Sequence, residues 1–202
     1  MNNQAEGDFC TITTFGSPVL RKKAPKVERF DAALTALAEE MLRAMYIAGG
    51  IGIAAPQMGC SLQLFVIDLQ LKNNADTVVF DGRSLPLSLM QPFYCVNPSF
   101  SPVNDVQLVA DEGCLSLPDV RGSVKRFHEI IVHYQDLSGE RHSLQCHDLF
   151  ARCIQHEADH LNGILFIDRL SKHERKEKQS LLNEIKSLGG TFDYYKEMND
   201  EL

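Results

Sequence analysis

The stretch QHEADHLNG, residues 155–163, places two histidines, a glutamate and an aspartate in a segment that otherwise has a helical pattern. His156 and His160 stand four positions apart, about one helical turn, so both imidazoles can reach one metal ion from the same side of a helix. Glu157 projects beside them. The pattern H-E-x-x-H on a helix is typical of a metal-dependent hydrolase. This stretch therefore predicts a helix that carries a catalytic metal site.

The limits and the faces of this helix are also predicted by the sequence. Asp148 is a suitable N-cap, and the pair Asn162-Gly163 is a suitable C-terminal stop. Helical spacing forms two neighbouring stripes: Leu149, Cys153, His156 and His160 in one, and Phe150, Ile154, Glu157 and Leu161 in the other. Because both stripes are otherwise apolar, the histidines and Glu157 are expected to face the core, where polar groups need partners. A metal ion would supply them, which makes a chance match on a solvated helix the weaker interpretation.

Two imidazoles do not complete a metal site, so a third ligand is needed. In the extended metalloprotease pattern a third histidine would stand where this chain has Phe166, and that class of protease is excluded. A carboxylate is the other solution used by peptidases. The available glutamates lie in a strongly charged segment, where solvated side chains are expected. They are Glu174, Glu177 and Glu184.

Cysteine is the remaining class of ligand, and the chain has six cysteines. Cys153 shares the histidine face but precedes His160 by seven positions, roughly 10 Å along a helix axis, which is too far for one ion to bind both easily. Cys153 is therefore predicted to line the site. Cys114, in EGCLSLP at residues 112–118, lies on a short segment that can approach the helix from another part of the fold. Its alternative is the apolar packing role of an ordinary buried cysteine.

Three motifs relate the chain to a known family. They are GIGIAAPQ at residues 50–57, EGCLSLP at residues 112–118 and QHEADHLNG at residues 155–163, and a PVLRKKA segment precedes them at residues 18–24. In these motifs and in their order, the chain resembles the peptide deformylases. The resemblance extends over about the first 170 residues.

The resemblance implies that Cys114, His156 and His160 hold one divalent metal ion. It implies Fe2+ as the physiological metal, with Zn2+, Ni2+ or Co2+ able to substitute, and ligation by two histidines and a cysteine would suit any of them. Three protein ligands leave a position open for water, which is typical of a catalytic site. Glu157 would act as general base toward that water and then as general acid toward the departing amine.

The reaction implied by the resemblance is removal of the formyl group from the N-terminal formyl-methionine of newly synthesised polypeptides, with release of formate. The groups that stabilise the oxyanion in the family, besides the metal, correspond here to the amide of Gln57 and the backbone N–H of Leu115. Gly50 and Gly52 fit a cramped site that admits a formyl group and excludes larger acyl groups. Arg121 is a candidate for contact with the substrate backbone, with a solvated surface arginine as the alternative.

Charged side chains are expected to orient the metal ligands. By the resemblance, Arg126 pairs with the motif carboxylates Glu112 and Asp159. Such partners fix the rotamers of the residues that bind a metal.

Composition and charge limit the class of protein. With 202 residues and 44% hydrophobic content, the chain suits one globular domain spanning residues 1–202. A net charge of −7 argues against a direct nucleic-acid role. The first residues lack the apolar run of a signal peptide, and no stretch is apolar enough to span a membrane, so the bacterial cytoplasm is the expected compartment. The cysteine spacing predicts no disulfide framework.

Helices separated from a run of strands favour an α+β fold, with largely antiparallel β-sheets packed around the central metal-binding helix. An N-terminal helix capped by Asp31 is expected to stop at Gly49-Gly50, and a charged C-terminal helix is expected to follow the metal helix. Strands are predicted at residues 62–69, 93–96, 106–110, 129–135 and 142–146, the last two as a hairpin around DLSGE.

Two segments depart from the compact pattern. Residues 68–92 are predicted to form an inserted loop or hairpin near the site. Residues 172–202 are predicted to form the C-terminal helix and a tail. Because a C-terminal helix docks on the ribosome in some bacterial deformylases, the resemblance implies the ribosome as a partner of residues 172–188.

Two alternatives to a deformylase remain open. One is a metallopeptidase that uses the same helix with a glutamate as the third ligand. The other is a non-catalytic binding module that the metal stabilises. The second is disfavoured because the chain keeps Glu157 and Gln57, and because structural metal sites usually fill all four positions.

Overall fold

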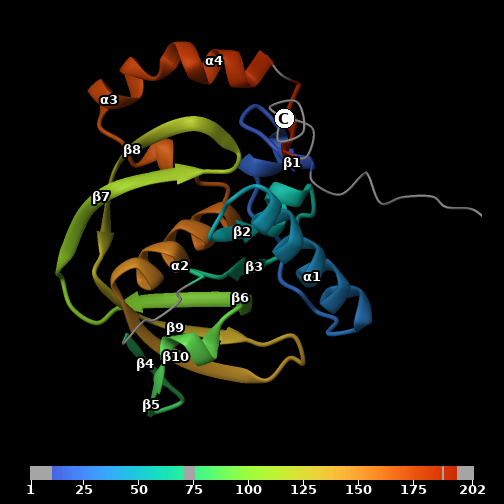
Figure 1. Ribbon diagram of the computed structural model, residues 1–202, viewed down its shortest axis with the longest axis vertical. Coiled ribbons are helices and arrows are strands. Elements are labelled where there is room, and N and C mark those ends of the chain that lie inside the picture. The colour runs from blue at the N-terminus through green and yellow to red at the C-terminus, as the bar shows by residue number, and fades with distance from the viewer. Residues whose placement is uncertain (1–10, 71–75, 188, 195–202) are drawn as a thin grey trace, which may run out of the picture.

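The computed structural model describes residues 11–70, 76–187 and 189–194, and its largest element is a seven-stranded antiparallel sheet (Figure 1). The strand order is β2-β3-β6-β9-β10-β4-β5. The strands are β2 (Gly52–Ala54), β3 (Leu64–Ile67), β6 (Phe93–Pro102), β9 (Glu129–Gln135), β10 (Arg141–His147), β4 (Thr77–Phe80) and β5 (Arg83–Pro86). Two further sheets have two antiparallel strands each: β7 (Gln107–Cys114) with β8 (Leu117–Phe127), and β1 (Thr11–Thr13) with β11 (Thr191–Asp193). The predicted α+β class with antiparallel sheets is confirmed.

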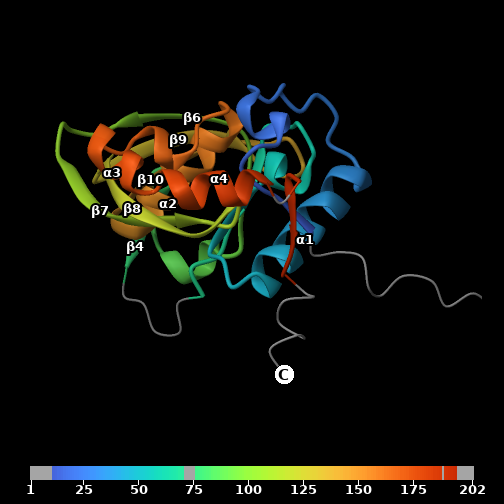
Figure 2. The same ribbon diagram turned by 90° about the horizontal axis from the view of Figure 1, so that it is seen from above.

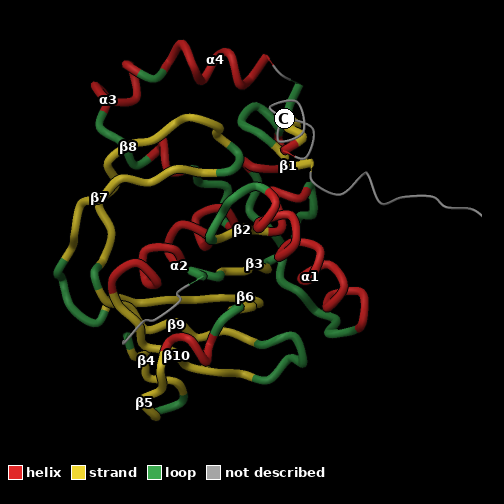
Figure 3. The backbone as a smooth tube through the Cα atoms, in the orientation of Figure 1, coloured by secondary structure: helices red, strands yellow, loops and turns green. Residues whose placement is uncertain are grey.

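The helix α2 (Asp148–Leu161) lies in the middle of the molecule. It contacts β2, β3, β9 and β10 of the large sheet on one side and β8 on the other. Helix α4 (Gln179–Ser187) packs on β8 in turn, so α4, the β7–β8 hairpin, α2 and the large sheet follow one another as layers (Figures 1 and 2). The tube in Figure 3 shows the β7–β8 hairpin curving over α2. Every residue of α2 from 153 to 161 is buried, which confirms the prediction that its polar side chains face the interior.

The prediction for the start of α2 is wrong by one residue. His147, the last residue of β10, is the N-cap, and Asp148 is the first helical residue. Asp148 has a φ of 54°, because the chain turns from strand to helix with no intervening loop. Aspartate adopts this left-handed conformation more readily than most residues. The predicted stop is confirmed, with Asn162 as C-cap and Gly163 at a φ of 72°.

Three apolar clusters form the core, and β3 separates two of them. Its side chains alternate, with Phe65 and Ile67 packed toward α2 and Leu64 and Val66 packed toward α1 (Ala32–Ile47). A strand buried on both faces shows no alternation of apolar and polar residues, and the sequence LFVI has none. The third cluster joins β8 to α4 and to the 3-10 helix η4 (Phe166–Asp168).

The predicted N-terminal helix is confirmed. The Asp31 side chain caps α1 by accepting hydrogen bonds from the backbone N–H groups of Ala33 and Leu34 at 3.1 and 3.2 Å. Its buried face recurs at helical spacing and consists of Leu34, Ala38, Met41, Ala44 and Met45. The helix ends at Ile47, just before Gly49, whose φ is 65°. Among the described residues, no helix is long and apolar enough to cross a membrane.

The strand predictions located β3, β6, β7, β9 and β10 but missed β8, which is the longest strand in the described part of the chain. The predicted β9–β10 hairpin is confirmed by the pairing of Arg141 with Gln135. The short strands β1, β2 and β11 were also missed. The remaining short helices are the 3-10 turns η1 (Pro18–Arg21), η2 (Ala55–Met58) and η3 (Leu87–Met90).

The predicted single C-terminal helix is corrected to two, α3 (Lys172–Glu177) and α4, which are separated at Lys178. The two helices differ in packing. Helix α3 buries no side chain, whereas α4 buries Leu182 and Ile185 in the apolar cluster that includes the buried residues of β8. The break at Lys178 therefore separates the solvent-exposed helix α3 from the packed helix α4. Residue 188 and residues 195–202 of the predicted helix and tail lie outside the described residues.

Within the predicted insertion at residues 68–92, the structure has the hairpin β4–β5 and η3, and residues 71–75 lie outside the described residues. Strand β4 pairs with β10, which adds the hairpin to the edge of the large sheet. The turn is formed by Asp81 and Gly82, both with positive φ, as two-residue hairpin turns require. Asp81 also accepts a hydrogen bond from the Ser143 backbone N–H at 2.8 Å and contacts His142 Nδ1 at 2.8 Å. That this segment is an insertion relative to the family stays a prediction.

His142 gives the stability of this edge a pH dependence. Burial, the largest influence, lowers the pKa of His142, but Asp81 and Asp136 on its two ring nitrogens outweigh burial and raise the pKa above its usual 6.5. A raised pKa adds stability that is fully present below pH 6.5 and is lost as pH rises through the folded-state pKa. We expect His142→Gln to lower the free energy of unfolding more at pH 6 than at pH 9, as measured by urea denaturation. His133→Gln, at an exposed position on β9, is the control, and an equal loss at both pH values would contradict the expectation.

Candidate metal centre and active site

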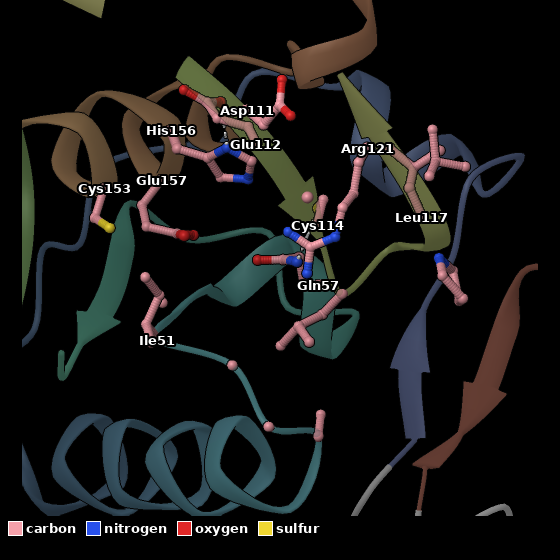
Figure 4. Close-up of a pocket in the computed structure, with 18 of the residues that line it drawn as sticks. Ile51, Gln57, Asp111, Glu112, Cys114, Leu117, Arg121, Cys153, His156 and Glu157 are labelled. Carbon is pink, nitrogen blue, oxygen red and sulfur yellow. Dashed lines mark hydrogen bonds and ion pairs between the residues drawn. The ribbon is translucent and has the colours of Figure 1, made fainter. Parts of the chain in front are cut away.

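Three metal-ligating side chains converge where the end of β7 meets α2. Cys114 comes from β7, and His156 and His160 come from α2; one ligand atom of each lies within 4.8 Å of the other two. The Cys114 Sγ atom is 3.2 Å from His160 Nε2. Figure 4 shows His156, Glu157 and Cys114 turned toward one space. The structure thus brings together the three residues predicted to bind the metal.

The tautomers and the donor types fit a divalent ion. His156 Nδ1 lies 2.9 Å from Glu112 Oε2. An ionised carboxylate can only accept, so Nδ1 carries the proton and Nε2 keeps its lone pair for a metal. His160 Nδ1 is buried, and within the described residues it has no hydrogen-bond partner. A thiolate with two imidazoles is a donor set suited to Fe2+, Zn2+, Ni2+ or Co2+.

The other candidate ligands lie apart from this group. Glu174 accepts a hydrogen bond from the Ser123 backbone N–H at 2.9 Å, and Glu177 and Glu184 are exposed on α3 and α4. Burial raises the pKa of the Cys153 thiol, which therefore stays protonated as it lines the cavity. A glutamate as third ligand has no support among the described residues.

The predicted network around Arg126 is confirmed. Arg126 donates two hydrogen bonds to Glu112, at 2.9 and 2.8 Å, and one to Asp159. All three side chains are at most 8% exposed. Burial, the largest single influence, raises the pKa of Glu112, but hydrogen bonds from Arg126 and His156 outweigh it and hold the pKa well below its usual value. Glu112 is therefore ionised, and because Arg126 holds it in place, it fixes the ring of His156.

Glu157 is the predicted acid/base, and its carboxyl group is buried beside Gly52. It is 4% exposed, and its Oε2 atom has no hydrogen-bond partner within the described residues. A Cβ atom at Gly52 would lie 2.5 Å from Glu157 Oε1, so a larger residue there would displace the carboxylate. Burial is the main cause that raises the pKa of Glu157 to about 7. A carboxyl group with this pKa can both accept and return a proton near neutral pH.

Gln57 presents its amide nitrogen to the site. Its Oε1 atom accepts a hydrogen bond from the Ala54 backbone N–H at 2.8 Å, which orients the amide. Its Nε2 atom therefore points the other way, 3.2 Å from Ser116 Oγ and 3.6 Å from Cys114 Sγ. Leu115 lies in the turn between β7 and β8. The amide donor of Gln57 and the turn carrying Leu115 thus adjoin the three ligands.

A cavity of about 730 Å³ opens over these groups. It is lined by the predicted substrate-binding residues Gly50, Gly52 and Arg121, together with Leu115 and Gln57. Gly50 lies against Leu115, since a Cβ atom on Gly50 would be 2.8 Å from a Leu115 methyl group. Arg121 is an exposed residue of this lining and pairs with Gly113 across the β7–β8 hairpin. In Figure 4 its side chain extends toward Cys114 and Gln57.

Sequence reasoning missed three charged or polar side chains of this region. Arg152 donates to Glu112 at 2.7 Å, Arg169 bonds to Asp159, and Tyr194 lines the cavity. The position of Arg152 could have been recognised from the sequence, because it lies one helical turn before His156 and so on the same side of the helix. No sequence pattern pointed to Arg169 or Tyr194, because both follow the last motif and reach the site only through tertiary folding.

Comparison with known proteins gives a consistent result. The polypeptide deformylase family profile matches residues 9–176. A peptide deformylase of Opitutus terrae is 50% identical over 166 residues, covering 81% of this chain and 86% of that protein. A peptide deformylase of Chlorobaculum tepidum is 40% identical over 175 residues, covering 86% of each. A structure of a peptide deformylase from Synechococcus elongatus in complex with actinonin is similar with a TM-score of 0.72 and 36% identity, covering 89% of this chain and 87% of that one.

Peptide deformylases are metal-dependent enzymes that remove the formyl group from N-formylmethionyl peptides. The family match extends over most of the chain and includes all three motifs. On the sequence, the fold and these relatives together, the chain belongs to the polypeptide deformylase family.

Proposed function

We propose that Cys114, His156 and His160 hold the metal ion of this peptide deformylase and that Glu157 is its acid/base. One observation carries the proposal: the three ligand atoms lie within 4.8 Å of one another, and two of these residues, Cys114 and His156, line the same cavity as Glu157. Among the described residues, the Oε2 atom of Glu157 has no hydrogen-bond partner. A buried carboxylate without a partner is costly unless a ligand completes its hydrogen bonds. This also argues against a non-catalytic module, which would have no use for such a group.

The proposed metal is Fe2+, with Zn2+, Ni2+ or Co2+ able to substitute. When bound, it would supply Lewis-acid activation of a water and of the formyl carbonyl. The donor set supports this group of metals but does not select among them. The described cysteines are free, which suits a thiolate ligand in a reducing compartment, and we propose the bacterial cytoplasm.

The protein groups have distinct proposed roles in the reaction. Glu157 takes a proton from the attacking water and returns one to the methionine amine as formate leaves. Gln57 Nε2 and the Leu115 backbone N–H donate hydrogen bonds to the oxygen of the formyl group as negative charge develops on it. Each such donor contributes about 2.7–4 kcal/mol of transition-state stabilisation in comparable sites.

The cavity wall supports a small acyl group as substrate. Gly50 and Gly52 leave no free space for added side-chain atoms, because Leu115 and Glu157 already occupy it. A formyl group carries only hydrogen on its carbonyl carbon and so needs the least room. We propose that Arg121, an exposed residue of the cavity lining, contacts the backbone of the N-formylmethionyl peptide.

A formate-release assay on a formyl-methionyl peptide, with protein purified without oxygen, tests this proposal. We expect metal-loaded wild type to release formate. Cys114→Ser should lose both bound metal, measured by elemental analysis, and activity, because a neutral hydroxyl replaces a thiolate. Cys153→Ala, at the buried cysteine that lines the same cavity, should keep the metal. No formate from metal-loaded wild type would refute the proposal, and metal loss in Glu177→Ala with retention in Cys114→Ser would favour a glutamate-ligated peptidase.

We propose the ribosome as a partner of α3 and α4, since nascent N-formylmethionyl chains are the substrate. The support is limited to exposed basic side chains on α3, including Lys172 and Lys176, which are interleaved with Glu174 and Glu177. Co-sedimentation with ribosomes tests this, and equal sedimentation of a Lys172→Glu, Lys176→Glu variant would reject the assigned surface.

A further inference from the structure

The turn that joins β7 to β8 is held by three separate parts of the chain. Gln57 Nε2 donates to Ser116 Oγ at 3.2 Å, and the backbone N–H of Phe15 donates to the Ser116 carbonyl at 2.9 Å. The hydroxyl of Tyr194 donates to the carbonyl of Leu115 at 2.7 Å. Two consecutive carbonyls of the turn are therefore fixed. The same turn contains the amide of Leu115 and directly follows Cys114 at the end of β7.

Phe15 and Tyr194 are placed by one small sheet, which brings together the first and last described strands. Strand β1 pairs with β11 through Ile12 and Phe192, and the Thr14 backbone N–H continues the pairing with the Gly190 carbonyl at 3.0 Å. Phe15 lies just after β1, and Tyr194 follows directly after β11. Because Ile12 is fully buried, the sheet is anchored in the core beside α1. In Figure 1, β1 lies beside the red strand β11.

The ring of Tyr194 is also held in place. It packs against the apolar cluster of α1 and β3, and its centroid lies 4.8 Å from that of Phe192 in an edge-to-face arrangement. It lines the cavity beside Leu115. A ring held by packing keeps its hydroxyl in one direction, so the hydrogen bond to Leu115 is geometrically defined.

We propose that Tyr194 is a positioning residue for deformylation: by holding the carbonyl of Leu115, it orients the amide of Leu115 toward the reacting carbonyl. This rests on the proposed role of that amide as an oxyanion donor. The N–H and C=O groups of one residue are connected through only its φ and ψ angles. With the carbonyls of Leu115 and Ser116 both held, the Leu115 amide has little freedom left. A donor that is already oriented needs no reorganisation as charge develops, which is the basis of oxyanion stabilisation.

The substitution Tyr194→Phe tests the proposal, because it removes the hydroxyl and keeps the ring that lines the cavity. Loss of one such hydrogen bond should lower kcat about threefold to tenfold. KM should be unchanged, because the interaction improves only the transition state. Tyr46→Phe is the matched control: it removes a hydroxyl that bonds to Asp68 at an exposed position, and kcat should stay at the wild-type value.

A second measurement distinguishes loss of the Leu115 amide's orientation from a general loosening of the site. A peptide H-phosphonate, in which a tetrahedral anionic phosphorus replaces the formyl carbon, should bind Tyr194→Phe less tightly by the same factor as kcat falls. The deformylated product peptide should bind both proteins equally. An unchanged kcat, equal weakening of both ligands, or a parallel loss of metal content and melting temperature would each overturn the positioning role. If wild type itself releases no formate, the proposed function fails and takes this inference with it; the other outcomes leave the deformylase assignment intact.

Discussion

Glu157→Gln is expected to lower kcat/KM for a formyl-methionyl peptide by about 10²–10⁴, the usual contribution of a positioned general acid/base. Glutamine has nearly the same shape, so it should occupy the space beside Gly52 that the carboxylate fills. It cannot accept the proton of water or return one to the amine. The metal should stay bound, since Glu157 is not among the three side chains proposed to bind it.

Formate release and elemental analysis on the same preparation check this expectation. Glu177→Gln makes the same chemical change at an exposed position on α3 and should keep wild-type activity. If Glu157→Gln retained activity within tenfold of wild type with its metal bound, another group would be handling the proton, and the proposed role of Glu157 would be wrong.

Arg126→Met is expected to lower the free energy of unfolding by about 3–5 kcal/mol, the usual effect of removing one partner from a buried ion pair. Methionine fills much of the same volume but leaves Glu112 with only Arg152 and His156 as partners, and Asp159 with only Arg169, among those described. The buried negative charges of Glu112 and Asp159 would then have too few positively charged partners. Since Glu112 also fixes the His156 ring, metal affinity should fall about 10–100-fold.

Urea denaturation and metal titration provide the two readouts. Lys125→Met is the control, because Lys125 is the preceding residue of β8 and points to solvent. Exposed charges of this kind contribute about 0–1 kcal/mol. Equal stability of the two variants would show that Arg126 is not needed to compensate the carboxylates.

The histidine pair was predictable from short-range pattern, and the other candidate residues came from the resemblance to the family. The four-residue spacing of His156 and His160 and their place on an apolar face indicate two of the three side chains that the fold brings together, whereas Cys114 was implied by the resemblance to the peptide deformylases. The apolar stripes of α2 predicted which side chains face the core, because a helix repeats its faces over a short stretch of sequence. The exact start of that helix was not predictable, because Asp148 is a suitable cap by type and only the abrupt turn out of β10 makes His147 the cap instead.

Strand β8 illustrates where pattern reading fell short. Val120, Gly122, Val124 and Arg126 alternate as its buried positions. A glycine and an arginine in that series break the apolar alternation that identifies a strand. Arg126 is buried only because Glu112 and Asp159 meet it, and those partners come from β7 and α2. Arg169 and Tyr194 were not predicted for the same reason, because their roles depend on which distant segments fold beside them.

The pairing of β1 with β11 also has a consequence for the order of folding. Thr11 pairs with Asp193, so this contact closes almost the whole described chain into one loop. Closing a long loop requires an entropy loss before any contact is gained, and such contacts tend to form late. During synthesis, β1 must wait for β11 to emerge, whereas the β9–β10 hairpin and α2 can form earlier. The turn that contains Leu115 and follows Cys114 therefore acquires its full set of supports only at the end of folding.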